Sequence, residues 1–208
     1  VGDRIAVTTT DTAYEAKRVI STLPPFLLQS SVQFSPQLST EFIQVAKNTH
    51  TWMGDSIKVG LRYATPFWRA ADKSGTIFSN VGPIPEMYDH TNVEENAYAL
   101  KGFFNGAYYS VNVEQRKAMV LTQLEKYYGP RVGDYLDYQE TVWRNEPFTF
   151  RDYDNHVLPH QHNGHPIFRQ AYWQGKLLIA GSETAEIHPG YMDGAVSSAH
   201  RVVDQLVV

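Results

Sequence analysis

Apolar and polar residues alternate along several segments of the chain, and this period of two predicts β-strands. The clearest case is 56–64, in which every second residue from Ile57 to Tyr63 is apolar and Pro66 ends the segment. Further strands are expected at 4–8, 16–22, 76–81, 98–104 and 135–143. A short apolar run at 176–181 is typical of a strand that is buried on both faces.

Helical spacing of apolar residues is clearest in two other segments. Residues 113–128 form a predicted helix, because Asn112 and Gln115 have capping-box spacing and Gly129 with Pro130 stops the pattern. Its expected apolar stripe is Val113, Ala118, Leu121, Leu124 and Tyr128. A second helix over 191–206 has apolar residues at Met192, Ala195, Val196, Ala199, Val202, Val203 and Leu206.

The remaining segments set the fold class. A short helix is expected from Ser39 to about Asn48, and 144–175 is long and irregular, as functional loops often are. Strands and helices alternate irregularly, which favours an α/β or α+β fold with a mixed sheet and argues against an all-β fold.

Composition narrows the classes of function. The 208 residues carry a net charge of −4, which argues against a general nucleic-acid binder. There is no Cys, so disulfides, Cys–zinc sites and thiol nucleophiles are excluded. No apolar run approaches the roughly 20 residues of a membrane span, and we expect a soluble, cytoplasmic protein. Because the chain starts at Val1, we expect a processed product or a piece of something longer.

The strand, turn and helix over 176–206 form half of a possible ligand site. A helix N-terminus offers N–H groups and positive charge to an anion or an electron-rich carbonyl. Gly190 lets a ligand approach the backbone, and Tyr191 stands in the first turn. Most strand–turn–helix units bind no ligand. The spacing of apolar residues in this segment is therefore equally consistent with a purely structural role.

The residues of this turn resemble a known family. Residues 180–185 (AGSETA) and 190–196 (GYMDGAV) are similar to the C-terminal flavin motif of the flavin-containing amine oxidases, including monoamine oxidase. Three more segments resemble that family in the same order, at 16–25, 34–38 and 66–69. The resemblance covers only the C-terminal half of the proteins of this family. This sequence contains no G-x-G-x-x-G motif, which binds the pyrophosphate of a dinucleotide.

The resemblance implies two domains. Residues 1–29 and 176–208 would be part of a Rossmann-like FAD-binding domain, and 30–175 would be a mixed-sheet substrate-binding domain. The two ends should pair with each other. A missing N-terminal half, or self-association, would complete the flavin site.

The resemblance also implies site residues. The cofactor-binding set would be Trp143, Gly181, Ser182, Glu183, Gly190, Tyr191 and Met192. The amine would lie between two aromatic rings, Tyr191 and Tyr153, which we take as the catalytic pair.

Two positions depart from the family. Asp152 stands where many monoamine oxidases attach the flavin through Cys, so FAD would be held non-covalently. Ala64 stands where much of the family places a Lys near the flavin, and Arg62 lies one same-face step away on that strand. The loss of this Lys bears on how fast oxygen reoxidises the flavin.

The implied reaction is hydride transfer from an amine to the flavin, which gives an imine, then aldehyde and ammonia, with oxygen reduced to hydrogen peroxide. Alternatives are an L-amino-acid or polyamine oxidase, a non-catalytic fragment, and one subunit of a split enzyme.

A metal-binding loop is a further hypothesis, because His156, His160, His162 and His165 lie close together. Solvated loop histidines are the simpler interpretation, and we assign no metal site.

Overall fold

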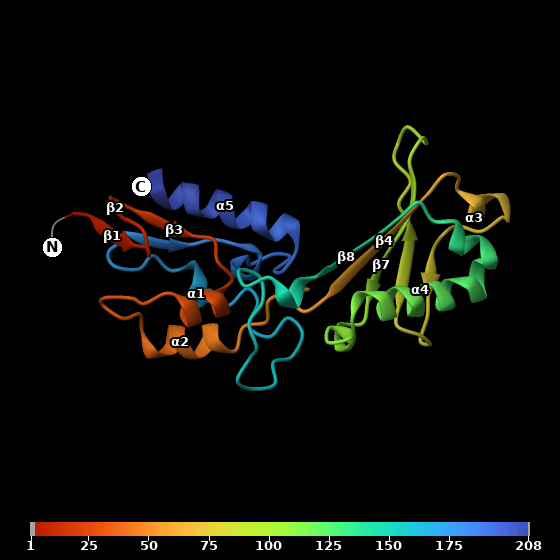
Figure 1. Ribbon diagram of the computed structural model, residues 1–208. Coiled ribbons are helices and arrows are strands. Elements are labelled where there is room, and N and C mark those ends of the chain that lie inside the picture. Colours follow the sequence, from red (N-terminus) through yellow and green to blue (C-terminus); the bar gives the residue numbers. More distant parts are fainter. Residues whose placement is uncertain (1–2, 208) are drawn as a thin grey trace. The chain divides into compact units, whose positions relative to one another are not determined.

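The chain divides into two compact units. A computed structural model describes residues 3–207, with the side chain of Val207 left out. Unit 1 contains the described residues up to Trp52 and those from Phe148 onward, and unit 2 is Met53–Pro147 (Figure 1). Each unit is described by itself below.

Unit 2 is built on one antiparallel sheet. Its strand order is β5-β6-β7-β4-β8, with β4 at Ile57–Tyr63, β5 at Ile77–Phe78, β6 at Glu86–Asp89, β7 at Tyr98–Phe104 and β8 at Asp137–Val142. Two helices accompany the sheet, α3 at Phe67–Ala70 and α4 at Val113–Tyr128. The central strand β4 alternates between buried and outward residues as its sequence predicts.

The core of unit 2 lies on one face of this sheet. Leu61 and Leu100 from the sheet, Trp68 from α3 and Leu124 from α4 are fully buried in it. The expected stripe on α4 was wrong in part, because Val113 is 44% exposed and Arg116 is buried instead. Arg116 is turned inward by a long-range partner, the carboxylate of Glu140 on β8.

Unit 1 brings the two ends of the sequence together. A hairpin of β1 (Ile5–Thr8) and β2 (Ala13–Ala16) precedes β3 (Val19–Ser21), and β3 pairs in parallel with β9 (Leu177–Ile179). The helices are α1 (Pro25–Ser31), α2 (Thr40–Lys47) and α5 (Met192–Val207). The parallel pair therefore belongs to unit 1 and the antiparallel sheet to unit 2.

Both faces of β9 are buried, which confirms the expectation from its apolar sequence. Leu177 and Ile179 pack into a cluster with Phe42 of α2. Leu178, on the opposite face, packs with Val202 of α5. The strand is thus held between α2 and α5, and α5 runs alongside the β3–β9 pair in Figure 1.

The boundaries between the units differ from the expected ones. The sequence placed 30–175 in one domain, whereas 30–52 and 148–175 lie in unit 1 with the two chain ends. The reason is packing between distant segments, since Phe42 of α2 contacts Phe168 and Tyr172 at ring-centroid distances of 5.7 and 5.3 Å. No local pattern indicates such contacts.

We predict that Leu100→Ala destabilises unit 2 by about 2–5 kcal/mol, because it leaves a cavity in a closed core. Leu136→Ala, at a site that is 55% exposed, is the matched control and should cost under about 0.5 kcal/mol. Urea unfolding followed by circular dichroism measures both. Equal effects of the two substitutions would contradict this description of the core.

Candidate functional site

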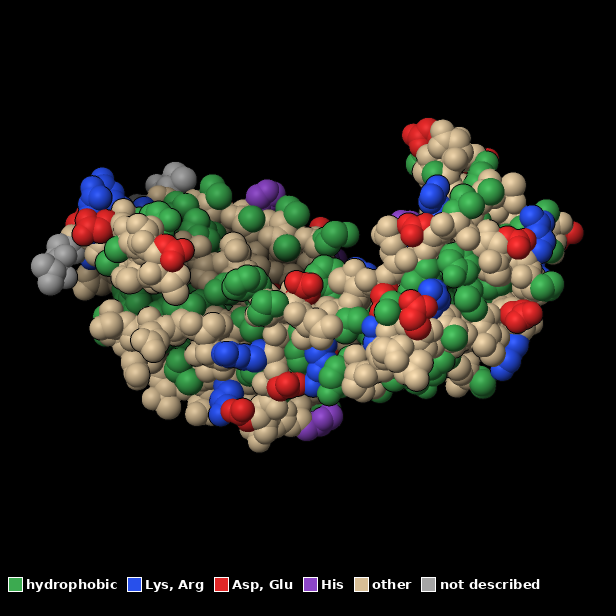
Figure 2. Space-filling model, in the orientation of Figure 1, with side chains coloured by type: hydrophobic (Ala, Val, Ile, Leu, Met, Phe, Trp, Pro, Cys, Tyr) green, Lys and Arg blue, Asp and Glu red, His purple; other side chains and the backbone are tan. Residues whose placement is uncertain are grey.

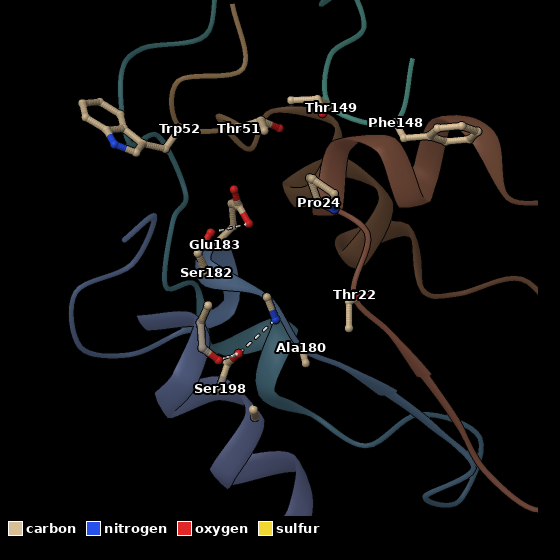
Figure 3. Close-up of a pocket in the computed structure, with 13 residues that line it drawn as sticks. Thr22, Pro24, Thr51, Trp52, Phe148, Thr149, Ala180, Ser182, Glu183 and Ser198 are labelled. Carbon is tan, nitrogen blue, oxygen red and sulfur yellow. Dashed lines mark hydrogen bonds between the residues drawn. The ribbon is translucent and has the colours of Figure 1, made fainter. Parts of the chain in front are cut away.

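The candidate site lies where the two parallel strands end. Thr22 follows β3, and residues 180–183 follow β9, so both segments meet at the carboxyl ends of the strands. In open α/β sheets this is where ligands bind. A cavity of about 470 Å³ opens there (Figure 3). It is lined by Thr22, Pro24, Thr51, Trp52, Phe148, Thr149, Ala180, Gly181, Ser182, Glu183, Ala195, Ser198 and Ala199.

The turn after β9 is fixed onto α5. The N–H of Gly181 donates to Oγ of Ser198 at 3.0 Å, and that hydroxyl donates to the carbonyl of Ala195 at 2.8 Å. Gly181 has φ of +128°, a conformation that side-chain-bearing residues rarely adopt. A Cβ there would lie 3.7 Å from both Thr22 O and Glu183 Oε2, which is ordinary van der Waals contact, so the backbone conformation and not lack of space favours glycine here.

Glu183 places a buried carboxyl group on the cavity wall. Its side chain is 6% exposed and accepts a hydrogen bond from Oγ of Ser182 at 3.0 Å. Burial raises the pKa of Glu183, and hydrogen bonds from Ser182 and from the backbone of Trp52 oppose this only in part. Such a group offers a hydrogen-bond acceptor to a hydroxyl or N–H of a ligand in the cavity.

The start of α5 is held by close backbone contacts. Gly190 has φ of +86°, and a Cβ on it would lie 3.2 Å from Cβ of Trp52. A Cβ on Gly194 would lie 2.3 Å from the carbonyl oxygen of His188, which leaves no room for a side chain. Nδ1 of His188 and Oδ2 of Asp193 lie 2.8 Å apart across this turn. The helix presents its positive dipole end here.

Three rings gather beside this helix start. The ring centroids of Trp52 and His160 are 4.0 Å apart, and those of His160 and Tyr191 are 5.9 Å apart, with both pairs stacked. The Trp52 and Tyr191 rings lie 6.0 Å apart. The sequence predicted Tyr191 at the first turn of this helix and named His160 only as one of four loop histidines. It gave no sign of Trp52, which comes from a segment far away in the chain.

Tyr153 has a different immediate setting. Its hydroxyl oxygen accepts a hydrogen bond from the N–H of Thr51 at 2.9 Å, and its ring lies 4.3 Å from that of Phe26. It therefore supports the residue that precedes Trp52 and contacts α1. Its expected role as the second ring of an amine site stays a prediction.

The other expected residues lie in different surroundings. Trp143 belongs to unit 2, where Nζ of Lys58 lies 5.7 Å from its ring, and its role beside a flavin stays a prediction. Met192 is the first residue of α5 and is 89% exposed. Ala64 and Asp152, the two departures from the family pattern, are both exposed.

The loop histidines do not gather into a metal site. Over residues 3–207, no group of three or more His, Cys, Asp or Glu side chains is arranged to hold a metal ion. His162 and His165 contact each other with ring centroids 5.9 Å apart. Nδ1 of His165 accepts a hydrogen bond from the N–H of Ile167, which gives this histidine a capping role.

Comparison with known proteins decides the family. The sequence matches the flavin containing amine oxidoreductase family over residues 2–207. The chain belongs to this family. It is 30% identical to the putative flavin-containing monoamine oxidase AofH of Mycobacterium tuberculosis, over 99% of this chain and 44% of that protein. It is also 30% identical to flavin-containing amine oxidase B of Homo sapiens, over 93% of this chain and 38% of that protein.

The fold agrees with this membership. A solved structure of putrescine oxidase with bound putrescine matches 99% of this chain and 46% of its own, at 29% identity and a TM-score of 0.84. The chain thus spans less than half of the length of the relatives that it matches. Within the described residues, no helix has the length and apolarity to cross a membrane.

Membership identifies the cofactor as a flavin, in agreement with the FAD that the sequence predicts. The cavity fits the aromatic and ribityl end of FAD, because small or apolar side chains such as Pro24, Ala180 and Ala199 line it beside the buried carboxyl of Glu183. The 208 residues hold no Cys that could form a thioether, so a flavin attached through sulfur is excluded for this chain.

We predict that Glu183→Gln makes the chain more stable at pH 8 than the unmodified protein. Because the folded-state pKa of Glu183 is raised, the folded chain binds its proton more tightly than the unfolded chain does. Stability therefore falls as the pH rises through the window above the ordinary value of 4.5. The variant, which cannot ionise there, should show a smaller loss between pH 4 and pH 8 in urea unfolding.

Glu186→Gln is the control, since the Glu186 side chain is 74% exposed. It should leave the pH dependence as it is. The account of Glu183 is wrong if Glu183→Gln lowers stability by the same amount at both pH values.

We predict that Gly194→Ala destabilises unit 1 by about 1–3 kcal/mol, because the added methyl meets the carbonyl of His188. At an ordinary helix position the same change stabilises by roughly 0.5–1 kcal/mol, so the sign of the effect is diagnostic. Gly133→Ala, where no atom lies within 4 Å of the added Cβ, is the control. A stabilising effect of Gly194→Ala in thermal unfolding would refute the close contact.

Proposed function

We propose that the protein oxidises an amine with FAD as the electron acceptor. The observation that carries this proposal is the cavity at the carboxyl ends of β3 and β9, because it combines the Gly181–Glu183 turn with Ala195, Ser198 and Ala199 of α5 in a chain of this family. When bound, the flavin supplies the acceptor for the hydride.

The residues of the turn would hold the cofactor. Gly181 leaves space beside the strand ends, and Ser182 and Glu183 offer polar atoms to the ribityl hydroxyls. Gly190 and Met192 lie at the start of α5, and the dipole end of this helix would stabilise the negative charge that a bound flavin gains on reduction. Trp52 and Phe148 are among the residues that line the cavity, but Phe148 is 82% exposed and leaves this side open to water.

Tyr191 would position the amine. Its ring is 51% exposed, so a π-face can receive the ammonium or amine group of a substrate. Tyr153 is retained as the proposed second ring, and Trp143 as a proposed flavin contact. The carbon next to the amine nitrogen loses a hydrogen with its electron pair. The imine so formed takes up water and gives aldehyde and ammonia, and oxygen takes the two electrons to become hydrogen peroxide.

We also propose that further polypeptide covers one side of unit 1. The parallel sheet of β3 and β9 has only two strands in the described residues, and Ile20 within it is 44% exposed. A stripe along α5 is exposed as well, at Met192, Val196, Ala199 and Val203. Figure 2 shows hydrophobic side chains at the surface in the region of α5. Parallel sheets are normally covered, and the relatives have an additional half that this chain does not span.

The class of amine is left open between simple amines, polyamines and L-amino acids. Putrescine oxidase, the similar solved structure, carries a diamine, which makes putrescine one member of a suitable test panel. A non-catalytic role, as a fragment or as a subunit of a split enzyme, predicts that no member of this panel reduces the flavin.

We predict that the chain, joined to the part of the M. tuberculosis relative that it does not cover, retains FAD through gel filtration. Under anaerobic conditions its absorbance near 450 nm should bleach on addition of benzylamine, putrescine or an L-amino acid. The variant Tyr191→Ala should retain FAD but bleach at least about tenfold more slowly, since a ring that orients the amine is lost. Retained FAD that no amine reduces would contradict amine oxidation.

A further inference from the structure

The outer face of the sheet in unit 2 has an open position on its strand β4. Gly60 is the middle residue of β4 and belongs to the set that faces away from the core. Apart from its chain neighbours, no atom lies within 4 Å of a Cβ built on Gly60, and its φ is outside the left-handed region. The register is continuous on both sides, so no bulge explains this glycine. A glycine within a strand that packing does not require marks a place where a ligand can approach the backbone closely.

The side chains around Gly60 are mostly cationic. Lys58 and Arg62 lie two positions away on β4, on the same face, which places their Cα atoms about 7 Å from that of Gly60. Lys101 of β7 is directly opposite Gly60 in the register, and Gln139 of β8 is directly opposite on the other side. Three cations and one amide therefore border the open position, and these five residues are called the Gly60 site below.

The two lysines of the Gly60 site have no acidic partner. In residues 3–207, neither Lys58 nor Lys101 forms an ion pair with an Asp or Glu side chain. Lys58 is opposite Phe103 and Thr141 in the register, and Lys101 is opposite Gly60 and Tyr88. Every cross-strand neighbour of these two charges is thus uncharged.

The ammonium groups lie near aromatic rings instead. Nζ of Lys101 is 5.0 Å from the ring centroid of Phe103, and Nζ of Lys58 is 5.9 Å from the same centroid. Nζ of Lys58 is also 5.7 Å from the Trp143 ring. Cation–π contacts of this kind are weak at exposed positions, and lysine side chains are flexible, so both ammonium groups can turn toward an anion.

Two carboxylates occur on the same face, and each is bonded to a neutral neighbour. Glu86 accepts a hydrogen bond from the hydroxyl of Tyr88, and Asp137 accepts one from the amide of Gln139 at 2.9 Å. Asp137 is opposite Arg62 in the register and offsets part of its charge. Because the whole chain has a net charge of −4, the positive charge at the two lysines is a local feature.

We propose that the Gly60 site binds the carboxylate group of a small ligand that also carries an aromatic group. The carboxylate lies over Gly60, where Lys58 and Lys101 donate charge-assisted hydrogen bonds to it. The aromatic group packs beside Phe103, which is half-buried next to both lysines. An inorganic anion would leave these ring contacts unused.

The site bears on which amines the protein takes. An L-amino acid carries the carboxylate that the Gly60 site binds, whereas a simple amine or a polyamine does not. The site therefore favours aromatic L-amino acids among the classes left open above. This last step rests on the proposed function, but binding of a carboxylate at Gly60 does not.

The test is a titration of the full chain without flavin, followed by the amide NMR resonances of unit 2. The ligand is 3-phenylpropionate, which has the ring and the carboxylate but no amine. Its neutral isostere 3-phenylpropanamide and inorganic phosphate form the two comparison arms. The proposal requires that 3-phenylpropionate shifts the amides of Gly60, Lys101 and Phe103 and binds more tightly than either comparison ligand.

Three variants locate the binding. Gly60→Val should abolish it, because the side chain fills the open position, yet its thermal midpoint should equal or exceed that of the unmodified chain. Lys101→Met should weaken 3-phenylpropionate binding roughly 2- to 5-fold, the range of an exposed charge pair. Lys126→Met is the matched control, since Lys126 is exposed on α4, the helix whose Leu124 packs in the core on the other face. It should leave the affinity unchanged.

Several results would overturn the proposal. It is wrong if 3-phenylpropionate does not bind, if Gly60→Val binds it as well as the unmodified chain does, or if phosphate binds at least as tightly. These outcomes are separate from the proposed function. Flavin reduction by simple amines, without carboxylate binding, would refute this inference alone, whereas carboxylate binding in a protein whose flavin no amine reduces would refute the proposed function alone.

Discussion

The site depends on one interaction, the parallel pairing of β3 with β9. Three residue pairs, from Val19 with Leu177 to Ser21 with Ile179, align the strand ends so that Thr22 lies beside the turn at 180–183. Packing on both faces maintains this pairing, because Leu178 meets α5 while Ile179 meets the α2 cluster. If the pairing were lost, the cavity wall and the start of α5 would separate.

Local signals allowed much of the fold to be predicted. The helix α4 begins and ends at the predicted residues, because Asn112 caps it and Gly129 has φ of +77° at its end. The strand β9 and the turn after it were also predicted, since a short apolar run indicates a strand buried on both faces. The positive φ of Gly181 came from the structure. These features depend on residues that are close together in the sequence.

Features that depend on distant residues could not be predicted. The inward turn of Arg116 requires Glu140, and the place of α2 in unit 1 requires Phe168. In the site, the same limit applied to Trp52 and His160, which join Tyr191 only after three separate segments fold together. The family motif supplied Gly181–Glu183 and Tyr191, whereas the residues around them came from the structure.

The central claim is that the crevice at the ends of β3 and β9 holds the flavin ring and its ribityl chain. This claim is tested most directly by amide NMR of the chain in two titrations. One uses riboflavin, which carries the flavin ring and ribityl chain, and the other uses AMP, which carries the adenine end of FAD. The account predicts riboflavin-induced shifts at Thr22, Gly181 and Glu183 and along α5 near Ser198, and no such shifts with AMP. Equal shifts with both ligands, or riboflavin shifts that leave this crevice unaffected, would contradict it.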